Sequence, residues 1–120
     1  MSDLEVTKTT LPGKAICIKM VGSIDSYTVS KLDRTLEQLF RQKRFYMLVD
    51  LSTVDYISSA GLGVLIGALQ RVDFERGRLI LINPTKDVME VFENVGLQGV
   101  FTFVESVEKG QVLIAEASSL

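Results

Sequence analysis

Two adjacent hydroxyl side chains, Ser58 and Ser59, stand directly before an apolar segment with helical periodicity. A serine hydroxyl becomes a nucleophile when a neighbouring base, most often a histidine, takes its proton. The chain contains no histidine and a single cysteine, so the usual activating base is missing. We therefore expect no catalytic residue and no enzymatic activity, and we interpret the two serines as groups that another protein modifies.

The position of this serine pair suits a phosphate group. The first amides of a helix lack partners within the helix and carry about half a positive charge, so they accommodate an anion. The same position suits a structural role, because a serine hydroxyl can accept a hydrogen bond from one of these amides and cap the helix. From spacing alone, both interpretations stay open for Ser58 and Ser59, and both can hold together.

Three glycines after the serine pair, Gly61, Gly63 and Gly67, superficially resemble a dinucleotide-binding motif. The pattern begins ten residues after Leu51, where we expect the preceding strand to end, and the following strand ends at Ile82 without an acidic partner for a ribose. A nucleotide-binding enzyme is therefore the least favoured hypothesis. The simpler interpretation is that these glycines let the helix and its turn approach the sheet or a partner closely.

Three aspartates, Asp25, Asp50 and Asp55, raise the hypothesis of a magnesium site like that of phospho-accepting receiver domains. Such a site needs an acidic pair after the first strand and a lysine after the last parallel strand, and the predicted strand ends carry neither. Other metal-ligand clusters need histidines or several cysteines, which are absent. We expect no bound metal and no cofactor.

Charge and hydropathy restrict the kinds of partner. Thirteen Lys and Arg against fifteen Asp and Glu give a formal net charge of −2, which provides no basic field for nucleic acid or an anionic membrane. The longest apolar run, Ala60–Leu69, is about half the length that spans a bilayer, and no signal peptide is evident.

Cys17 lies between two isoleucines, which predicts a buried thiol in a reducing compartment. We expect protein partners in the cytoplasm.

Hydrophobic patterning places the serine pair between a strand and a helix. The predicted strands are apolar or alternating segments, at 4–10, 14–21, 45–51, 78–82 and 100–104. The predicted helices carry apolar stripes at three- and four-residue spacing, at 29–40, 59–74, 84–95 and 107–117. Residues 22–26 are expected to break the second strand, and the apolar segment 45–51 is expected at the centre of the sheet.

The resulting order, β-β-α-β-α-β-α-β-α, predicts an α/β fold. The first two strands form a hairpin through a turn with Pro12 and Gly13. The later strand-helix-strand alternation requires parallel pairing with right-handed crossovers. We expect a mixed, mostly parallel β-sheet with an N-terminal hairpin and helices packed around it, in a single domain covering residues 1–120.

Several residues are predicted to begin or end the helices. Ser26 and Ser106 can cap the first and last helices, and Pro84 suits the first position of the third. Gly96 suits a left-handed end of the third helix, with Leu97 closing an apolar contact just beyond it.

Three motifs carry a family resemblance: Gly22–Asp25 before the first helix, Val49–Ser52 in the central strand, and Ile57–Gly63 at the head of the second helix. With them, the chain from about Ala15 to Ala117 resembles the STAS domains of bacterial anti-anti-sigma factors, which are anti-sigma factor antagonists. The resemblance implies the STAS fold.

The resemblance also implies a function. An unphosphorylated protein of this class binds an ATP-dependent anti-sigma factor serine kinase and thereby releases the sigma factor. Phosphorylation by that kinase switches the protein off, and a metal-dependent serine phosphatase resets it. We expect a monomer in this role.

The family's glycine-leucine-glycine register implies which residues carry the switch. Ser59 matches the phosphate acceptor, Ser58 stands in the place of an aspartate and is the secondary candidate, and Ala60 replaces a second hydroxyl residue. Asp25 matches an acidic residue before the first helix, although it can equally be a turn or cap residue. The expected partner-binding residues are Asp25, Ser26, Ser58, Ser59, Ala60, Gly61 and Leu62.

Phosphorylation has a simple physical consequence at such a surface. It adds roughly −1.5 to −2 charges, and a cost of about 3 kcal/mol against an apolar or acidic partner lowers the affinity roughly a hundredfold. No large conformational change is required. The alternative function is that of a STAS subunit in another assembly, such as a signalling scaffold or a lipid-transport complex, in which Ser59 is never phosphorylated.

Overall fold

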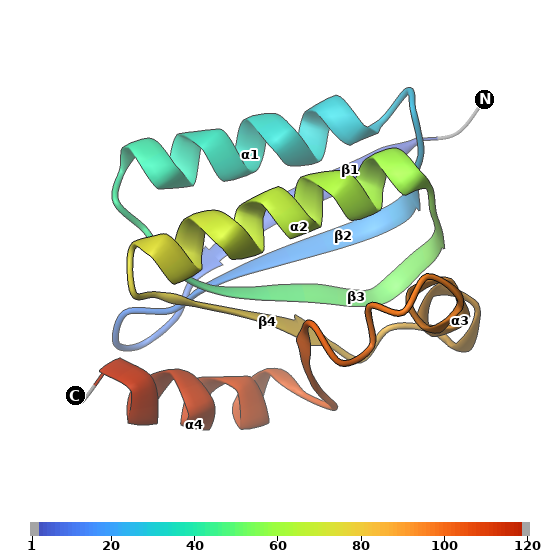
Figure 1. The fold of residues 1–120 in the computed structure, drawn as a ribbon. Helices are drawn as coiled ribbons and strands as arrows, with labels where there is room; N and C mark the ends of the chain where they lie inside the picture. Colours follow the sequence, from blue (N-terminus) through green and yellow to red (C-terminus); the bar gives the residue numbers. More distant parts are fainter. Residues whose placement is uncertain (1–2, 119–120) are drawn as a thin grey trace.

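The computed structural model describes residues 3–118, which form a five-stranded sheet and four helices (Figure 1). The strands are β1 (Leu4–Thr10), β2 (Ile16–Ile24), β3 (Tyr46–Ile57), β4 (Arg78–Ile82) and β5 (Thr102–Val104). The helices are α1 (Val29–Arg41), α2 (Ser59–Phe74), α3 (Lys86–Asn94) and α4 (Val107–Ser118). The predicted order of elements is confirmed.

The strands lie in the sheet in the same order as in the chain, β1-β2-β3-β4-β5. β1 pairs antiparallel with β2, and every later pair is parallel. The predicted mixed sheet with an N-terminal hairpin is therefore confirmed, as is the central position of β3.

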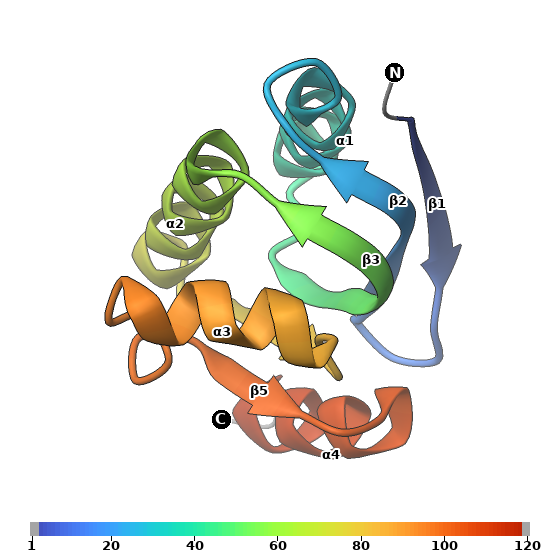
Figure 2. The same ribbon diagram turned by 90° about the vertical axis from the view of Figure 1, so that its right-hand side faces the viewer.

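Alternate residues of the strands divide the core into two layers, because successive side chains of a strand point to opposite faces. Met47 and Val49 belong to the larger layer, with α1, α2 and α3, whereas Leu48 packs with Ile114 of α4 in the smaller layer. Figures 1 and 2 show α1 and α2 together over one face of the sheet and α4 on the other. Cys17 belongs to the smaller layer and is buried as predicted, and this burial raises the pKa of its thiol.

Two strands run further than their apolar patterns predicted. β2 continues through residues 22–24, where a break was expected, and β3 continues past Leu51 to Ile57. Gly22 permits the extension with a φ of +121°, and a side chain there would collide with the carbonyl oxygen of Asp3. The register between β2 and β3 shifts beside Gly22, as at a β-bulge. The polar residues in both extensions therefore belong to strands.

The third helix and the last strand are shorter than predicted. Pro84 precedes α3 instead of opening it, because Thr85 takes the N-cap position and its Oγ1 accepts a hydrogen bond from the Val88 N–H at 3.2 Å. Val95, expected in the buried stripe, is the C-cap residue and is 56% exposed. β5 comprises Thr102–Val104 alone.

Two other predicted helix ends, at the end of α3 and at the start of α4, are confirmed. Gly96 has a φ of +76°, and the Leu97 N–H donates to the Phe92 carbonyl oxygen at 2.8 Å, which closes the end of α3. Ser106 caps α4, because its Oγ accepts from the Lys109 N–H at 3.2 Å.

Candidate functional site

Two turns lie at the end of the sheet where the parallel strands finish (Figure 2). One joins β2 to α1 and contains Asp25 and Ser26, and the other joins β3 to α2 and contains Ser58. The Ser58 N–H donates to the Ile24 carbonyl oxygen at 2.8 Å, so the two turns are directly bonded. This bond places the predicted acidic residue and the serine pair in one surface region.

Ser58 is the N-cap residue of α2. Its Oγ accepts a hydrogen bond from the Gly61 N–H at 3.2 Å, and its carbonyl oxygen accepts from the Leu62 N–H at 3.0 Å. The residue is half-buried. The capping interpretation is therefore correct for Ser58, whose hydroxyl oxygen is engaged in holding the helix.

Ser59 is the first residue of α2, and its side chain is exposed. Its hydroxyl makes no hydrogen bond with any of residues 3–118. The first turn of α2 contains no acidic residue, so the positive end of the helix dipole beside Ser59 is not neutralised by its own helix. The two serines therefore differ, because only the Ser59 hydroxyl has no structural use within the described chain.

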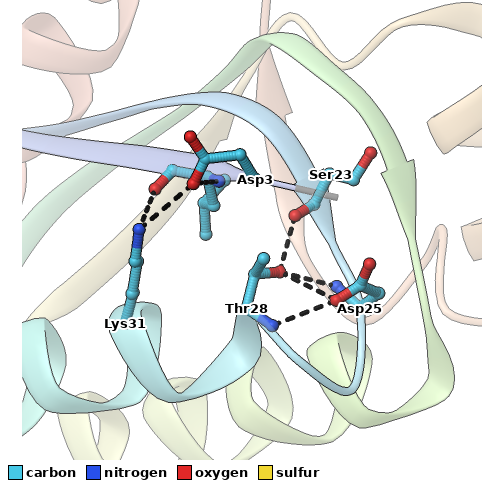
Figure 3. Close-up of polar contacts among 6 residues, drawn as sticks. Asp3, Ser23, Asp25, Thr28 and Lys31 are labelled. Carbon is cyan, nitrogen blue, oxygen red and sulfur yellow. Dashed lines mark hydrogen bonds and ion pairs between the residues drawn. The ribbon is translucent and has the colours of Figure 1, made fainter. Parts of the chain in front are cut away.

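Asp25 organises the neighbouring turn (Figure 3). Its Oδ1 accepts hydrogen bonds from the N–H groups of Tyr27 at 2.9 Å and Thr28 at 3.0 Å. The buried Thr28 hydroxyl donates to the Ser23 carbonyl oxygen at 2.6 Å and accepts from the Asp25 N–H at 3.0 Å. Asp25 therefore satisfies the amides before α1 in place of the predicted Ser26, and Thr28 is the N-cap residue. The interpretation of Asp25 as a turn residue is confirmed.

A second contact in Figure 3 ties α1 to the edge of the sheet. Asp3 Oδ1 accepts from the Leu4 N–H at 2.8 Å and from Lys31 Nζ at 3.2 Å. Both interactions favour the charged carboxylate and lower the pKa of Asp3. They help to hold β1 against the first turns of α1.

The remaining predicted contact residues divide by exposure. Ser26 and Ala60 are exposed, whereas Gly61 and Leu62 are buried. A Cβ atom on Gly61 would lie 2.7 Å from Cγ2 of Ile24, so only glycine fits there. Gly61 and Leu62 therefore support the serine turn from within.

Sequence patterns missed two exposed aromatic residues at this end of the sheet. Tyr27, in the turn after Asp25, is 84% exposed, and Tyr56, two residues before Ser58, is 52% exposed. Neither belongs to a periodic apolar stripe, so hydrophobic patterning could not identify them. For Tyr27 the available signal was its position between two polar residues, Ser26 and Thr28, since exposed tyrosines are common anchors of protein interfaces.

The three aspartates of the magnesium hypothesis each have a local role. Asp50 Oδ1 accepts from the N–H and the hydroxyl of Ser52, at 2.9 and 2.6 Å. Asp55 accepts from the Ser23 hydroxyl at 2.5 Å, and Asp25 holds its turn. Within residues 3–118, no three acidic, histidine or cysteine side chains are grouped to hold a metal ion.

The predicted gap between the third strand and the glycine motif is wrong. β3 reaches Ile57, so Gly61 follows its strand after three residues, and the expected gap after Leu51 does not exist. The packing around Gly61 is what disfavours a dinucleotide-binding motif. The open side of Gly61 is filled by Ile24 and Ile57, which leaves no room there for a phosphate.

The length and hydropathy of the four helices in residues 3–118 also bear on membrane insertion. None of them combines enough length with enough apolar character to cross a membrane.

Comparisons with known proteins agree with this geometry. The STAS domain model matches residues 5–110. An anti-sigma-B factor antagonist of Listeria monocytogenes is 31% identical over 93 residues, which cover 78% of this chain and 81% of that protein. A solved anti-sigma factor antagonist of Mycobacterium paratuberculosis superposes with a TM-score of 0.84 at 17% identity, covering 94% of this chain and 95% of that one.

A third similar structure is that of a phosphorylated protein. The Bacillus cell fate determinant SpoIIAA, solved in its phosphorylated form, superposes with a TM-score of 0.71 at 19% identity, covering 90% of this chain and 96% of that chain. Such structural likeness supports the fold, and the family-model match over most of the chain supports membership. The chain therefore belongs to the STAS domain family, which also includes the anti-sigma factor antagonists that it resembles.

Proposed function

We propose that this protein is an anti-sigma factor antagonist controlled by phosphorylation of Ser59. In its unphosphorylated form it binds an anti-sigma factor serine kinase, which then releases its sigma factor. The observation that carries the proposal is the contrast at the start of α2, where Ser58 holds the helix and the exposed Ser59 hydroxyl has no internal partner among residues 3–118. A kinase can reach such a hydroxyl without unfolding its substrate.

The relatives support the same assignment. The similar proteins of Listeria monocytogenes and Mycobacterium paratuberculosis are named as antagonists of anti-sigma factors, and Bacillus SpoIIAA has been solved in a phosphorylated form. In this proposal the chain is a substrate and binding module with no catalytic residue of its own. A metal-dependent serine phosphatase returns it to the binding form, and the cycle takes place in the cytoplasm.

The proposed docking surface comprises the two bonded turns. Asp25 and Ser26 lie on one turn, and Ser58, Ser59 and Ala60 lie on the other, with Gly61 and Leu62 beneath them. Tyr27 adds the largest exposed aromatic side chain of this surface. We expect Ser59, Ala60 and Tyr27 to contact the partner directly.

Electrostatics supply the switch. A phosphate on Ser59 adds roughly −1.5 to −2 charges to a surface that already carries the carboxylates of Asp25 and Asp55. An apolar partner surface must then remove water from this charge, and an acidic partner surface is repelled by it. A cost of about 3 kcal/mol lowers the affinity roughly a hundredfold, which releases the kinase without reshaping either turn.

The test uses the purified protein, the candidate kinase of the same organism, and ATP with Mg²⁺. We expect one phosphate on Ser59 by mass spectrometry, none on the Ser59→Ala variant, and continued phosphorylation of Ser58→Ala. Calorimetry without ATP turnover should show that Ser59→Asp binds the kinase at least about tenfold more weakly than the unmodified protein. Gln42→Glu, which adds a negative charge at the opposite end of α1, should bind normally.

Two results would contradict the proposal. One is phosphate confined to residues other than Ser58 and Ser59, and the other is unchanged kinase binding by Ser59→Asp. Binding to transport or scaffold components in the absence of any kinase interaction would favour the alternative STAS assembly.

A further inference from the structure

A groove of about 490 Å³ runs between α1 and α2 on the outer face of the molecule. Figure 1 shows the two helices lying together along the sheet, with their N-termini at the serine end. Ala60, the residue after Ser59, lines the groove at this end, and Arg71 lines it three turns further along α2. The groove is therefore continuous with the proposed docking surface.

The α2 wall of the groove contains two glycines that the fold itself does not require. A Cβ atom on Gly63 or Gly67 would meet nothing within 4 Å, and neither residue has a left-handed φ. In contrast, a Cβ atom on Gly61 or Gly77 would collide with the protein. Because glycine inside a helix costs about 1 kcal/mol relative to alanine, Gly63 and Gly67 weaken α2 with no compensating internal contact. What they leave is a helix backbone that another chain can approach closely.

The α1 wall of the groove is acidic. Asp33 and Glu37 lie four residues apart and line the groove, and neither forms an ion pair with a residue in the range 3–118. Arg71 lies with its guanidinium carbon 5.4 Å from the Phe40 ring centre and 5.7 Å from that of Phe45. Among the described residues, the groove thus offers two carboxylates without ion pairs along one side and a single cation at its far end.

These features point to a particular occupant. A second copy of the chain is the less favoured occupant. Each copy carries Asp33, Glu37 and Arg71, so two copies would bring four carboxylates against only two guanidinium groups. A helix with basic side chains one turn apart matches the acidic wall, because residues at i and i+4 share one face. Small residues allow such a helix to approach closely, and its apolar side chains can contact the half-buried Val64 on the groove floor.

We infer that the groove binds a basic, amphipathic helix of the anti-sigma factor. This inference rests on the proposed function and identifies a second part of the same interface. The helix lies against Gly63 and Gly67, with its cations facing Asp33 and Glu37. The Ser59 turn and the groove then form one continuous surface, and a single partner covers both.

The first test fills the groove without changing the serine turn. Gly67→Leu should weaken binding to the anti-sigma factor about tenfold or more in calorimetry, whereas Gln70→Leu, on the exposed surface of α2 outside the groove, should leave it unchanged. Gly67→Ala should raise the melting temperature, because nothing in the fold opposes its Cβ. Far-UV circular dichroism of each variant verifies the fold.

The second test reverses the charge of the acidic wall. The Asp33→Lys and Glu37→Lys double variant should also bind about tenfold more weakly or worse. A photo-crosslinker at position 67 should label a basic helical segment of the purified anti-sigma factor, and reversal of the basic residues there should restore binding to the double variant.

The outcomes separate the groove from the switch. Loss of binding by Ser59→Asp together with normal binding by Gly67→Leu and by the double variant would overturn the groove alone. An unmodified protein that fails to bind the anti-sigma factor would overturn both proposals. Concentration-dependent self-association that Gly67→Leu abolishes, measured by analytical ultracentrifugation, would assign the groove to a second copy and overturn the inference.

Discussion

At the scale of single residues, the serine pair shows how adjacent and chemically identical groups acquire different roles. The hydroxyl oxygen of Ser58 accepts from the Gly61 N–H, whereas Ser59 is exposed one residue further on. The difference follows from position, since the N-cap side chain can reach the amides of the first turn and the next residue already belongs to the helix. Ser59 thereby stays available to an enzyme.

This division predicts different effects on stability. Ser58→Ala removes the cap of α2 and should lower the free energy of unfolding by about 1 kcal/mol. Ser59→Ala should change it by less than about 0.5 kcal/mol, as for most surface substitutions. Urea unfolding followed by circular dichroism measures both values, and equal losses in the two variants would contradict the assigned roles.

The residues of the site could be predicted only in part from the sequence. The glycine register and the family resemblance identify Ser59 as the candidate acceptor, but the type and spacing of Ser58 and Ser59 allow either to be the cap. Their roles depend on which hydroxyl reaches the Gly61 amide, which only the folded turn determines. Tyr27 was missed because its exposure depends on the turn that Asp25 holds.

At the scale of elements, sequence patterning predicted the bounds of the edge strand β1 and of the interior strand β4 well, and the polar extensions of β2 and β3 poorly. β1 and β4 have the predicted bounds, because the sequence pattern of each strand ends at the residue where its backbone pairing with the neighbouring strand ends. The extensions of β2 and β3 contain polar residues that are satisfied across the strand pair, as Ser23 and Asp55 are. Such pairing joins residues far apart in the chain, so local patterning cannot reveal it.

The last helix contains a glycine whose cost is explained by the sheet beneath it. A Cβ atom on Gly110 would lie 2.7 Å from Cδ2 of Leu48, which is fully buried in β3. The small residue therefore lets α4 lie close to the sheet, and this benefit offsets the lower helix propensity of glycine.

Gly110→Ala should consequently destabilise the protein by about 1–3 kcal/mol, as other overpacking substitutions do. Gly67→Ala is the matched control, because it makes the same change on α2 in open space and should stabilise by up to about 1 kcal/mol. Thermal unfolding of both variants shows whether the two substitutions change the stability in opposite directions. A Gly110→Ala variant as stable as the control would mean that α4 is not pressed against Leu48.

At the scale of the whole molecule, the site rests on a fully buried part of the core. Ile24 and Ile57, which end β2 and β3 beneath the two turns, are almost completely buried, as is Leu65 in α2. Interiors packed in this way resist small displacements. A charge on Ser59 should therefore act on an approaching partner and not by deforming its own protein.

This rigidity can be measured by NMR on the isolated protein. Ser59→Asp should shift backbone amide signals of residues 23–28 and 56–63, while those of α4 and of the β1–β2 hairpin turn stay unchanged. Shifts that spread through α4 would instead indicate a conformational mechanism, and binding would then have to be explained by a population shift.

The sequential order of the strands, β1 to β5 across the sheet, has a consequence for synthesis of the chain. Each strand from β2 to β5 pairs with the strand made just before it, so a partner is already present when each of them is synthesised. Every element that positions the two turns, from β1 to α2, precedes residue 75. The two turns of the proposed docking surface are thus encoded before β4, α3, β5 and α4, which are added to the fold after them.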